Sequence, residues 1–217
     1  MLTYNEAQRF YDSFGKKQSK QFYEESAMNN LIELGKFDEA KNIIEFGCGT
    51  GKLASRLLKN ILSRKCYYLG VDISQTMVAL CQKNIEQYSD RAKCYKNEGK
   101  PIINITDQSA DRFISTYVLD LLTEEDIIVL LNEAYRILLP GGYLCLASLT
   151  HGTSFVSHIV EFIWSSLYKL KPSIVGGCRP IKISEYLQND KWHILHDSTI
   201  VSYGVPSEVV IARRLQH

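Results

Sequence analysis

Short apolar runs alternate with amphipathic stretches between residues 41 and 150. Runs at 42–46, 67–72, 92–95, 112–118 and 143–149 predict strands, and the apolar positions between them recur every three or four residues, which predicts helices. Strands separated by helices of this length are typical of a parallel sheet with helices on both faces. The pattern therefore predicts an α/β domain built on a doubly wound, mostly parallel sheet.

Polar residues mark where two of these helices begin, and a glycine turn marks where one ends. Ser74 is placed to cap a helix that carries Met77 and Val78, and Thr123 with Asp126 resembles a capping box. The run Pro140-Gly141-Gly142 predicts the end of the second helix.

The two ends of the chain depart from this alternation. Residues 1–40 have a helical, polar-aromatic pattern and form a segment separate from a main domain at 41–217. A long apolar helix is predicted at 154–170, and strands near 192–197 and 207–213, with little helix between them, predict a terminal hairpin antiparallel to the other strands. The apolar positions of 154–170 cover more than one face. The helix either packs on the sheet, or its surplus face lines an apolar pocket or forms a contact in a homodimer.

Composition excludes several classes of protein. The 217 residues carry 25 basic and 24 acidic side chains, which gives no electrostatic footprint for nucleic acid. No apolar run is long enough to predict a transmembrane segment, and the first residues lack the pattern of a secretory signal. The six cysteines show no metal-ligand spacing, so we expect free thiols, no metal site and a cytoplasmic protein.

The most informative motif is the run from Glu45 to Gly51, which follows the first strand and precedes a helix. Its glycines, Gly47, Gly49 and Gly51, permit a sharp turn and the close approach of a ligand. Asp72 ends the next strand, where an acid accepts hydrogen bonds from both hydroxyls of a ribose.

The G-x-G-x-G spacing differs from the G-x-G-x-x-G spacing of dinucleotide-binding proteins. A carboxylate as close as Glu45 would also repel a pyrophosphate, but it suits a ligand that carries an ammonium group. We therefore expect a nucleoside cofactor other than NAD(P), and an oxidoreductase or a cofactor-binding protein without activity is the alternative.

These motifs together resemble class I S-adenosylmethionine-dependent methyltransferases. The resemblance covers about residues 40–150: the glycine turn, Gly70-Val71-Asp72, and Leu138-Leu139-Pro140-Gly141-Gly142 before an apolar strand. It is strongest to the small-molecule branch with the quinone and sterol enzymes. The resemblance implies a Rossmann-like sheet of seven strands with the last antiparallel, S-adenosyl-L-methionine as cofactor, and an N-terminal lid at 1–40 in which Tyr4, Tyr11 or Tyr23 closes over the cofactor.

The resemblance also assigns site residues. The three glycines and Cys48 line the amino-acid part of the cofactor with Glu45 nearby, and we expect Cys48 to serve packing, since no base adjoins it in sequence. Asp72 holds the ribose and Ile73 packs on adenine. Asn97 or Glu98 contacts the adenine amine, in place of an aspartate usual in relatives, and Ser115 borders the methionine part.

The acceptor of the methyl group is expected to be a small, apolar or amphipathic molecule, because both 1–23 and 154–170 are rich in aromatic residues. Methyl transfer from a sulfonium needs a base only when the acceptor must lose a proton. His151 follows the fifth strand, at the sheet edge where cofactor and acceptor meet, and is the candidate general base. The alternative is a surface or capping histidine.

Overall fold

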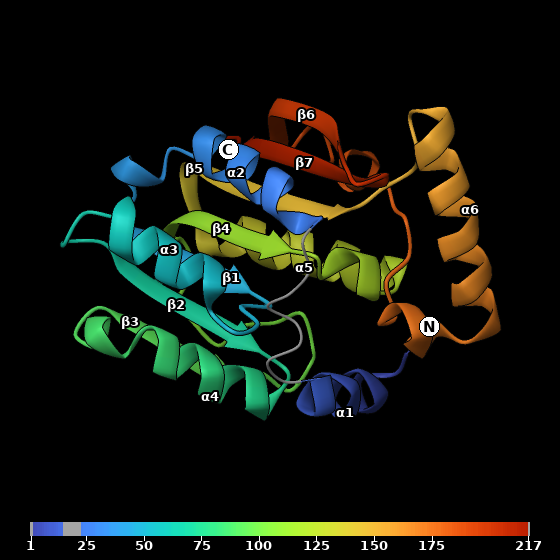
Figure 1. Ribbon diagram of the computed structural model, residues 1–217. Helices are drawn as coiled ribbons and strands as arrows, with labels where there is room; N and C mark the ends of the chain where they lie inside the picture. The colour runs from blue at the N-terminus through green and yellow to red at the C-terminus, as the bar shows by residue number, and fades with distance from the viewer. Residues whose placement is uncertain (1, 15–22, 217) are drawn as a thin grey trace.

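The computed structural model describes residues 2–14 and 23–216. Its centre is a seven-stranded sheet in the order β3-β2-β1-β4-β5-β7-β6, in which only the pairs of β7 with β5 and β6 are antiparallel. The predicted doubly wound sheet and its antiparallel terminal hairpin are therefore confirmed (Figure 1).

The elements follow the expected order. The strands are β1 (Asn42–Phe46), β2 (Tyr67–Asp72), β3 (Ala92–Lys96), β4 (Ala110–Thr116), β5 (Leu138–Leu149), β6 (Trp192–Ser202) and β7 (Val205–Arg214). The helices are α1 (Tyr4–Phe14), α2 (Glu24–Leu34), α3 (Lys52–Asn60), α4 (Gln75–Asn84), α5 (Glu124–Ile137) and α6 (Phe155–Leu170). Short 3-10 turns lie at Phe37–Glu39, Glu86–Tyr88, Leu119–Leu121, Pro172–Val175 and Ile183–Tyr186.

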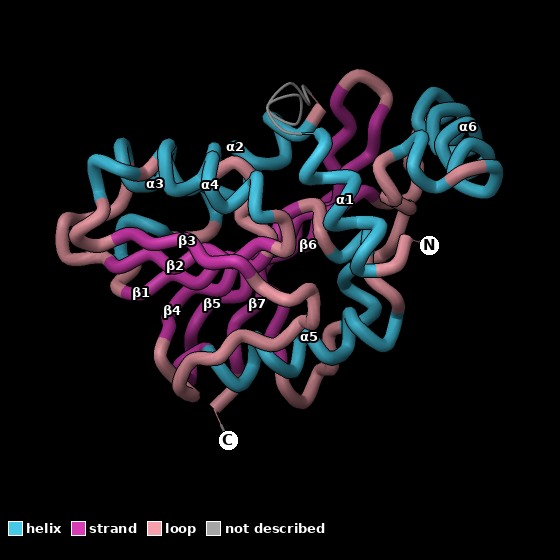
Figure 2. The backbone as a smooth tube through the Cα atoms, turned by 90° about the horizontal axis from the view of Figure 1, so that it is seen from below, coloured by secondary structure: helices cyan, strands magenta, loops and turns pink. Residues whose placement is uncertain are grey.

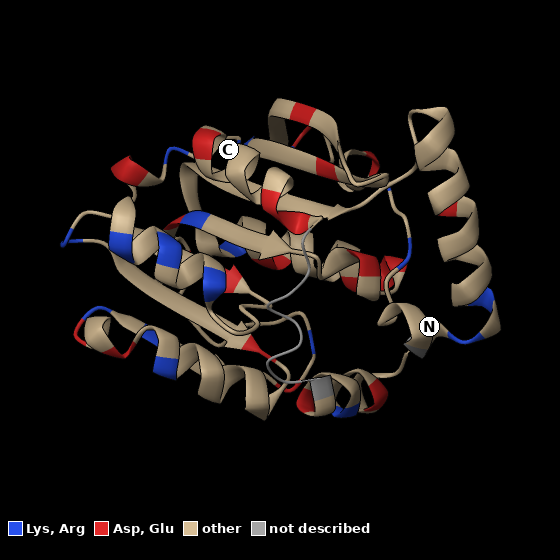
Figure 3. Ribbon diagram, in the orientation of Figure 1, with Lys and Arg blue, Asp and Glu red and all other residues tan. Residues whose placement is uncertain are grey.

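Side-chain caps fix where the helices begin. The Ser74 hydroxyl accepts a hydrogen bond from the amide of Met77, and the Thr123 hydroxyl accepts one from the amide of Asp126, as the sequence predicts. Acidic residues gather in the first turn of α5, where they favour the positive end of the helix dipole (Figure 3). Ser154 forms a full capping box with Ser157 at α6.

Helices cover both faces of the sheet, so the core has two layers (Figure 2). One layer packs α2, α3 and α4 against the sheet, with Leu31, Leu57 and Cys81 among its buried side chains. The other packs α5 against the opposite face around Phe113 and Ile127. Both layers are apolar because neighbouring side chains of a central strand point to opposite faces.

Two expectations about local structure are corrected. β4 ends at Thr116, two residues earlier than predicted, because Tyr117 turns the chain with a φ of 54°. Cys81 and Cys94 form a disulfide instead of remaining free thiols, since α4 packs beside β3 and brings their Cα atoms to 6.5 Å. The spacing of 13 residues gave no sign of this pairing, which depends on how the helix lies on the strand.

The helices α1 and α6 lie beyond the carboxyl ends of the parallel strands. α1 contacts α4, and α6 lies at the outer side of the domain, where it contacts β7 and the Pro172–Val175 turn (Figure 1). The indole nitrogen of Trp164 donates to the carbonyl of Cys178 at 3.0 Å, but Phe155 and Phe162 on α6 are exposed. Residues 15–22 of the expected helical segment lie outside the described residues. Within the described part of the chain, no helix is both long and apolar enough to cross a membrane.

Candidate cofactor and acceptor site

The glycine turn has the backbone shape that the sequence predicts. Gly47, Gly49 and Gly51 have φ values of 80°, 51° and 75°, a region that strongly favours glycine. A Cβ atom on Gly51 would also lie 2.8 Å from the sulfur of Cys81. The turn therefore requires glycine both for its backbone conformation and for its close packing on α4.

Asp72 is fixed at the end of β2 directly beside this turn. One carboxylate oxygen accepts from the amide of Gly49 at 2.8 Å and the other from the amide of Ser74 at 2.9 Å. Burial raises the pKa of Asp72, while these two amides oppose that shift. Each oxygen keeps a second lone pair, so the carboxylate can still accept hydrogen bonds from a ligand.

Glu45 lies under the turn with its side chain buried. The hydroxyl of Tyr68 donates to its carboxylate at 2.5 Å, and burial raises the pKa of Glu45 to about 7. A buried carboxylate with one partner is costly to leave charged, and a nearby cation would lower that cost. The position therefore suits a ligand with an ammonium group.

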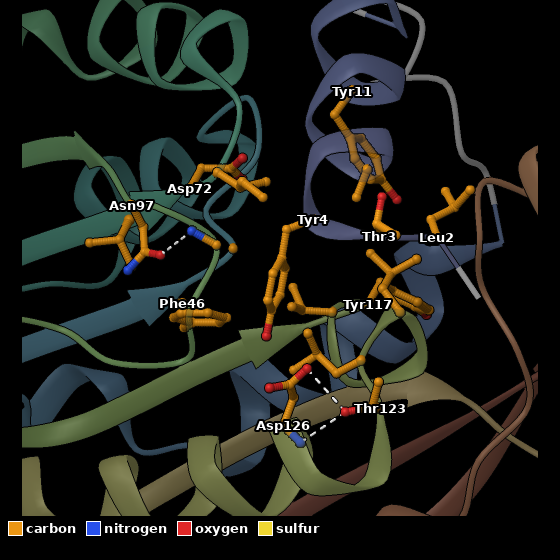
Figure 4. Close-up of a pocket in the computed structure, with 18 of the residues that line it drawn as sticks. Leu2, Thr3, Tyr4, Tyr11, Phe46, Asp72, Asn97, Tyr117, Thr123 and Asp126 are labelled. Atoms are coloured by element: carbon orange, nitrogen blue, oxygen red, sulfur yellow. Dashed lines mark hydrogen bonds between the residues drawn. The ribbon is translucent and has the colours of Figure 1, made fainter.

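Two adjoining cavities flank the turn. The first, of about 300 Å³, is drawn in Figure 4 and is lined by Asp72, Ile73 and Asn97 on the sheet side and by residues of α1 on the other. The second, of about 90 Å³, is lined by Glu24, Glu45 and Gly49. They adjoin because both are lined by Gly47, Thr116 and Tyr117.

Most predicted cofactor-binding residues therefore lie together. The first cavity contains Gly47, Asp72, Ile73 and Asn97, and the second contains Glu45, Gly47, Cys48 and Gly49. Gly51 lines neither cavity and supports the turn from behind. The roles assigned to these residues toward a cofactor stay predictions.

The structure separates Asn97 from Glu98. The Asn97 side chain accepts from the amide of Gly99 at 2.7 Å and donates to the carbonyl of Ile102 at 2.9 Å, which holds it at the wall of the first cavity. Glu98 instead lines a separate cavity beside β3, which Asn97 also lines. Of the two candidates, Asn97 is the one with access to the first cavity.

Ser115 lies one residue away from the cavities. It is buried, and its hydroxyl donates to the carbonyl of Phe46 at 3.0 Å, which ties β4 to the end of β1. Its neighbour Thr116 lines both cavities. Neighbouring side chains of a strand point to opposite faces of the sheet, so Ser115 and Thr116 face different sides of β4.

Cys48 is buried in the second cavity wall, and burial raises the pKa of its thiol well above the ordinary value. Its sulfur lies within 4.8 Å of those of Cys81 and Cys94. Since the latter two form a disulfide, only Cys48 has a free thiol in this group. A protonated thiol is a weak nucleophile, which favours the packing role over a chemical one.

His151 is turned away from both cavities. Its ring nitrogen Nδ1 lies 2.6 Å from a carboxylate oxygen of Glu161 on α6, and 60% of the side chain is exposed. Glu161 also accepts from the amide of Gly152 at 2.8 Å. The structure therefore does not bring His151 together with the glycine turn. The role of His151 as a general base stays a prediction, and the place of its side chain does not support that role.

The helix α1 covers the first cavity, and sequence patterns missed what fixes it there. Tyr4 and Tyr11, two of the expected lid tyrosines, line the cavity, with Tyr4 packed against Gly99 and directed toward Asp126 (Figure 4). A carboxylate oxygen of Asp12 accepts from the hydroxyl of Ser74 at 2.5 Å and from the amide of Thr76 at 3.2 Å. No local signal reveals this contact, since it joins the start of the chain to α4.

Comparison with known proteins agrees with this geometry. Residues 43–142 match a family described as a methyltransferase domain. The carboxy-S-adenosyl-L-methionine synthase of Photorhabdus laumondii subsp. laumondii is 31% identical over 105 residues, which are 48% of this chain and 41% of that protein. The chain thus matches less than half the length of this curated relative.

Solved structures share the fold over the whole chain. The [4+2]-cyclase SpnF has a TM-score of 0.76 at 14% identity, covering 100% of this chain and 98% of that one. The N-methyltransferase NodS of Bradyrhizobium japonicum WM9, in complex with S-adenosyl-L-homocysteine, has a TM-score of 0.72 at 13% identity and covers 98% of both chains.

The fold and the glycine turn with its acid define a Rossmann-like nucleoside-binding domain of the methyltransferase type. Over residues 43–142 the chain is similar to S-adenosylmethionine-dependent methyltransferase domains, and its fold is the Rossmann-like methyltransferase fold.

Proposed function

We propose that this protein transfers the methyl group of S-adenosyl-L-methionine to a small amphipathic molecule. The observation that carries the proposal is the Asp72 carboxylate, held by the Gly49 and Ser74 amides between the glycine turn and the first cavity. The curated relative that matches 105 residues of this chain is named a carboxy-S-adenosyl-L-methionine synthase, which supports a cofactor of this kind.

The two cavities suit the two parts of the cofactor. In the first, Asp72 would accept hydrogen bonds from the ribose, Ile73 would pack on adenine, and Asn97 would face its edge. In the second, Glu45 and Glu24 would face the ammonium group of the methionine part. Lys52, which also lines it, pairs with Glu25 at 3.0 Å and supplies positive charge for the carboxylate.

The cofactor supplies an activated methyl group, so the protein needs to position the acceptor and exclude water. The apolar side chains of Leu121, Leu122 and Ala7 line the first cavity beside the lid. They favour an acceptor with an apolar part, and they keep the region beside the sulfonium dry.

Calorimetry with S-adenosyl-L-methionine and S-adenosyl-L-homocysteine tests cofactor binding. Asp72→Ala should weaken both by about 1.5–3 kcal/mol for each hydrogen bond lost to the ligand. A melting curve without ligand checks that the variant still folds, because the substitution also removes the acceptor of the Gly49 and Ser74 amides. The matched control is Asp90→Ala, an exposed acid just before β3, at the opposite end of the strands from Asp72. Unchanged affinity in Asp72→Ala would contradict the placement of the ribose.

Incubation with labelled S-adenosyl-L-methionine and metabolite pools separates an enzyme from a protein that only binds the cofactor. Transfer of label to a small molecule, lost in Asp72→Ala, supports the proposal. Binding of NAD in place of S-adenosyl-L-methionine would instead favour an oxidoreductase.

A further inference from the structure

The outer face of α6 is apolar and exposed. The large apolar side chains that lie on it are Phe155, Val156, Ile159, Phe162, Ile163 and Leu170. They recur every three or four positions, so they occupy about a third of the helix circumference. Phe155 is 82% exposed, Phe162 73% and Leu170 80%. Folded domains normally bury side chains of this kind, and a continuous row of them on one helix marks a contact surface.

The inner face of α6 holds the helix in this orientation. The indole nitrogen of Trp164 donates to the carbonyl of Cys178 at 3.0 Å, and the carboxylate of Glu161 accepts from the amide of Gly152 at 2.8 Å. These contacts lie on the side of the helix opposite the apolar row. α6 therefore cannot turn that row toward the domain without breaking them.

The apolar surface continues beyond both ends of α6. Near the start of the helix, a Cβ atom on Gly204, in the turn between β6 and β7, would lie 3.1 Å from a γ carbon of Val160. Tyr203 in the same turn is 79% exposed. After the end of the helix, Ile174 of the Pro172–Val175 turn is exposed as well. The outer face of α6, with Tyr203 and Ile174, is called the α6 surface below.

The charged side chains at the border of the α6 surface are basic. Lys169 and Lys171 are exposed at the carboxyl end of the helix. On α6 and in residues 199–204 the only acid is Glu161, whose side chain is 19% exposed. Figure 3 shows the result, since basic residues lie at one end of α6 and in the loop that follows it. The charge of this surface therefore complements an anionic partner.

Neither the candidate site nor a second copy of the chain explains the α6 surface. α6 lines neither of the two cavities that flank the glycine turn. In a symmetric pair the same surface faces itself, so Lys169 and Lys171 would meet a surface without an exposed acid to pair with them. An anionic bilayer meets both needs, because its headgroups attract the lysines and its interior accepts a convex apolar row without a matching groove.

We propose that the α6 surface docks the protein on an anionic lipid bilayer. With 16 residues, α6 is about 24 Å long and lies along the bilayer, with Phe155 and Phe162 between the headgroups and the acyl chains. Lys169 and Lys171 bind anionic headgroups while their stems lie on apolar surface. This inference is independent of the proposed function, because it concerns a surface outside both cavities.

Docking through this surface brings the first cavity close to the bilayer. α6 continues into the Pro172–Val175 turn, and a Cβ atom on Gly177 after that turn would lie 2.8 Å from Leu2 and 3.5 Å from Leu121. Both leucines line the first cavity. One short segment therefore connects the docking surface to the cavity wall.

Co-sedimentation with lipid vesicles measures docking. The protein is mixed with vesicles of phosphatidylcholine alone, and with mixed vesicles in which about 30% of the lipid is the anionic phosphatidylglycerol. We expect binding to the mixed vesicles to be at least tenfold stronger, because each lysine near an anionic surface contributes roughly fivefold. Added salt should weaken this binding, since salt screens the charges of the lysines.

Replacing two phenylalanines tests the apolar part of the surface. Phe155→Ser together with Phe162→Ser should weaken binding to the mixed vesicles at least tenfold, because two rings no longer enter the bilayer. Serine and phenylalanine have similar helix propensities and both positions are exposed, so the helix should remain. The control makes the same change at an exposed tyrosine of β2 and an exposed isoleucine of α5, Tyr67→Ser with Ile128→Ser, and should bind like the wild type.

Replacing two lysines tests the charged part. Lys169→Gln together with Lys171→Gln should weaken binding to the mixed vesicles at least tenfold and leave it less sensitive to salt. The control is Lys59→Gln with Lys83→Gln, exposed lysines on α3 and α4, and should change neither property. Melting curves and calorimetry with S-adenosyl-L-homocysteine should match the wild type for every variant, which separates this test from that of the proposed function.

The inference fails if the wild type does not sediment with the mixed vesicles, if the phenylalanine variant binds as tightly as the wild type, or if a control loses as much binding as its matched variant. Sedimentation velocity without lipid measures the alternative. A wild type that is a dimer, that becomes a monomer in the phenylalanine variant and that does not bind vesicles would assign the α6 surface to a second copy of the chain instead.

Discussion

Replacing Asp120 by asparagine is expected to change how the stability of the protein depends on pH. The folded protein holds the pKa of Asp120 near 7 by burial, against an ordinary value of 3.8. The folded state therefore binds a proton more tightly than the unfolded state does. The contribution of Asp120 to stability is greatest below pH 3.8, falls as pH rises between 3.8 and about 7, and is constant above that.

The size of this effect follows from the difference in pKa. Three units correspond to roughly 4 kcal/mol, of which about 2.5 kcal/mol falls between pH 5 and 8. The value is an upper limit, because removing the charge of Asp120 also lowers the pKa of Glu24. Asparagine cannot ionise, but its buried amide costs about 1–3 kcal/mol if it stays without partners.

Urea unfolding at pH 5, 6, 7 and 8, followed by tryptophan fluorescence, measures the free energy of unfolding of both proteins. As pH rises, the free energy of unfolding of Asp120→Asn should increase relative to that of the wild type. The total relative change over this range should be about 2 kcal/mol. Glu33→Gln, which replaces an exposed acid of α2, serves as the control, and its free energy of unfolding should follow that of the wild type at every pH. Parallel curves for Asp120→Asn would refute the argument that burial raises the pKa of this acid.

Substituting both Cys81 and Cys94 by serine should lower the free energy of unfolding by about 3 kcal/mol, since their disulfide closes a loop of about 13 residues; equal stability of oxidised and reduced wild-type protein would count against the bond. Asp12→Ala should weaken binding of S-adenosyl-L-homocysteine about three- to tenfold by releasing α1 from α4, and calorimetry with no change in affinity would show that the anchor is dispensable. His151→Ala should leave kcat within about twofold because the imidazole faces Glu161; a loss of 100-fold or more, with a changed pH profile, would restore it as the base.

Much of the fold was predictable because it depends on local patterns. The strand at 42–46 and the helices capped by Ser74 and Thr123 follow from apolar periodicity and from side chains that bond the nearest free amides. The glycine turn was predictable for a similar reason, since three close glycines permit the positive φ values that the turn requires.

The predictions and the structure differ where the chain departs from regular geometry. Ser115 was assigned from the resemblance alone, whereas its hydroxyl bonds the Phe46 carbonyl and its neighbour Thr116 lines both cavities. Tyr117 ends β4 with a φ that its side chain gives no reason to expect. His151 was chosen for its place at the end of β5, but the direction of its side chain depends on Glu161, ten residues further along the chain.

The sequence by itself determined the layered α/β fold, the glycine turn and the acid beside it, because each depends on neighbours within a few residues or on the alternation of strands and helices. Only the tertiary structure decided what surrounds the turn: the Asp12 anchor of α1, the disulfide between α4 and β3, and the burial of Asp120 beside Glu24. These contacts join segments that lie far apart in the chain. Their energies depend on distance and burial in the folded protein, which no local pattern of residues specifies.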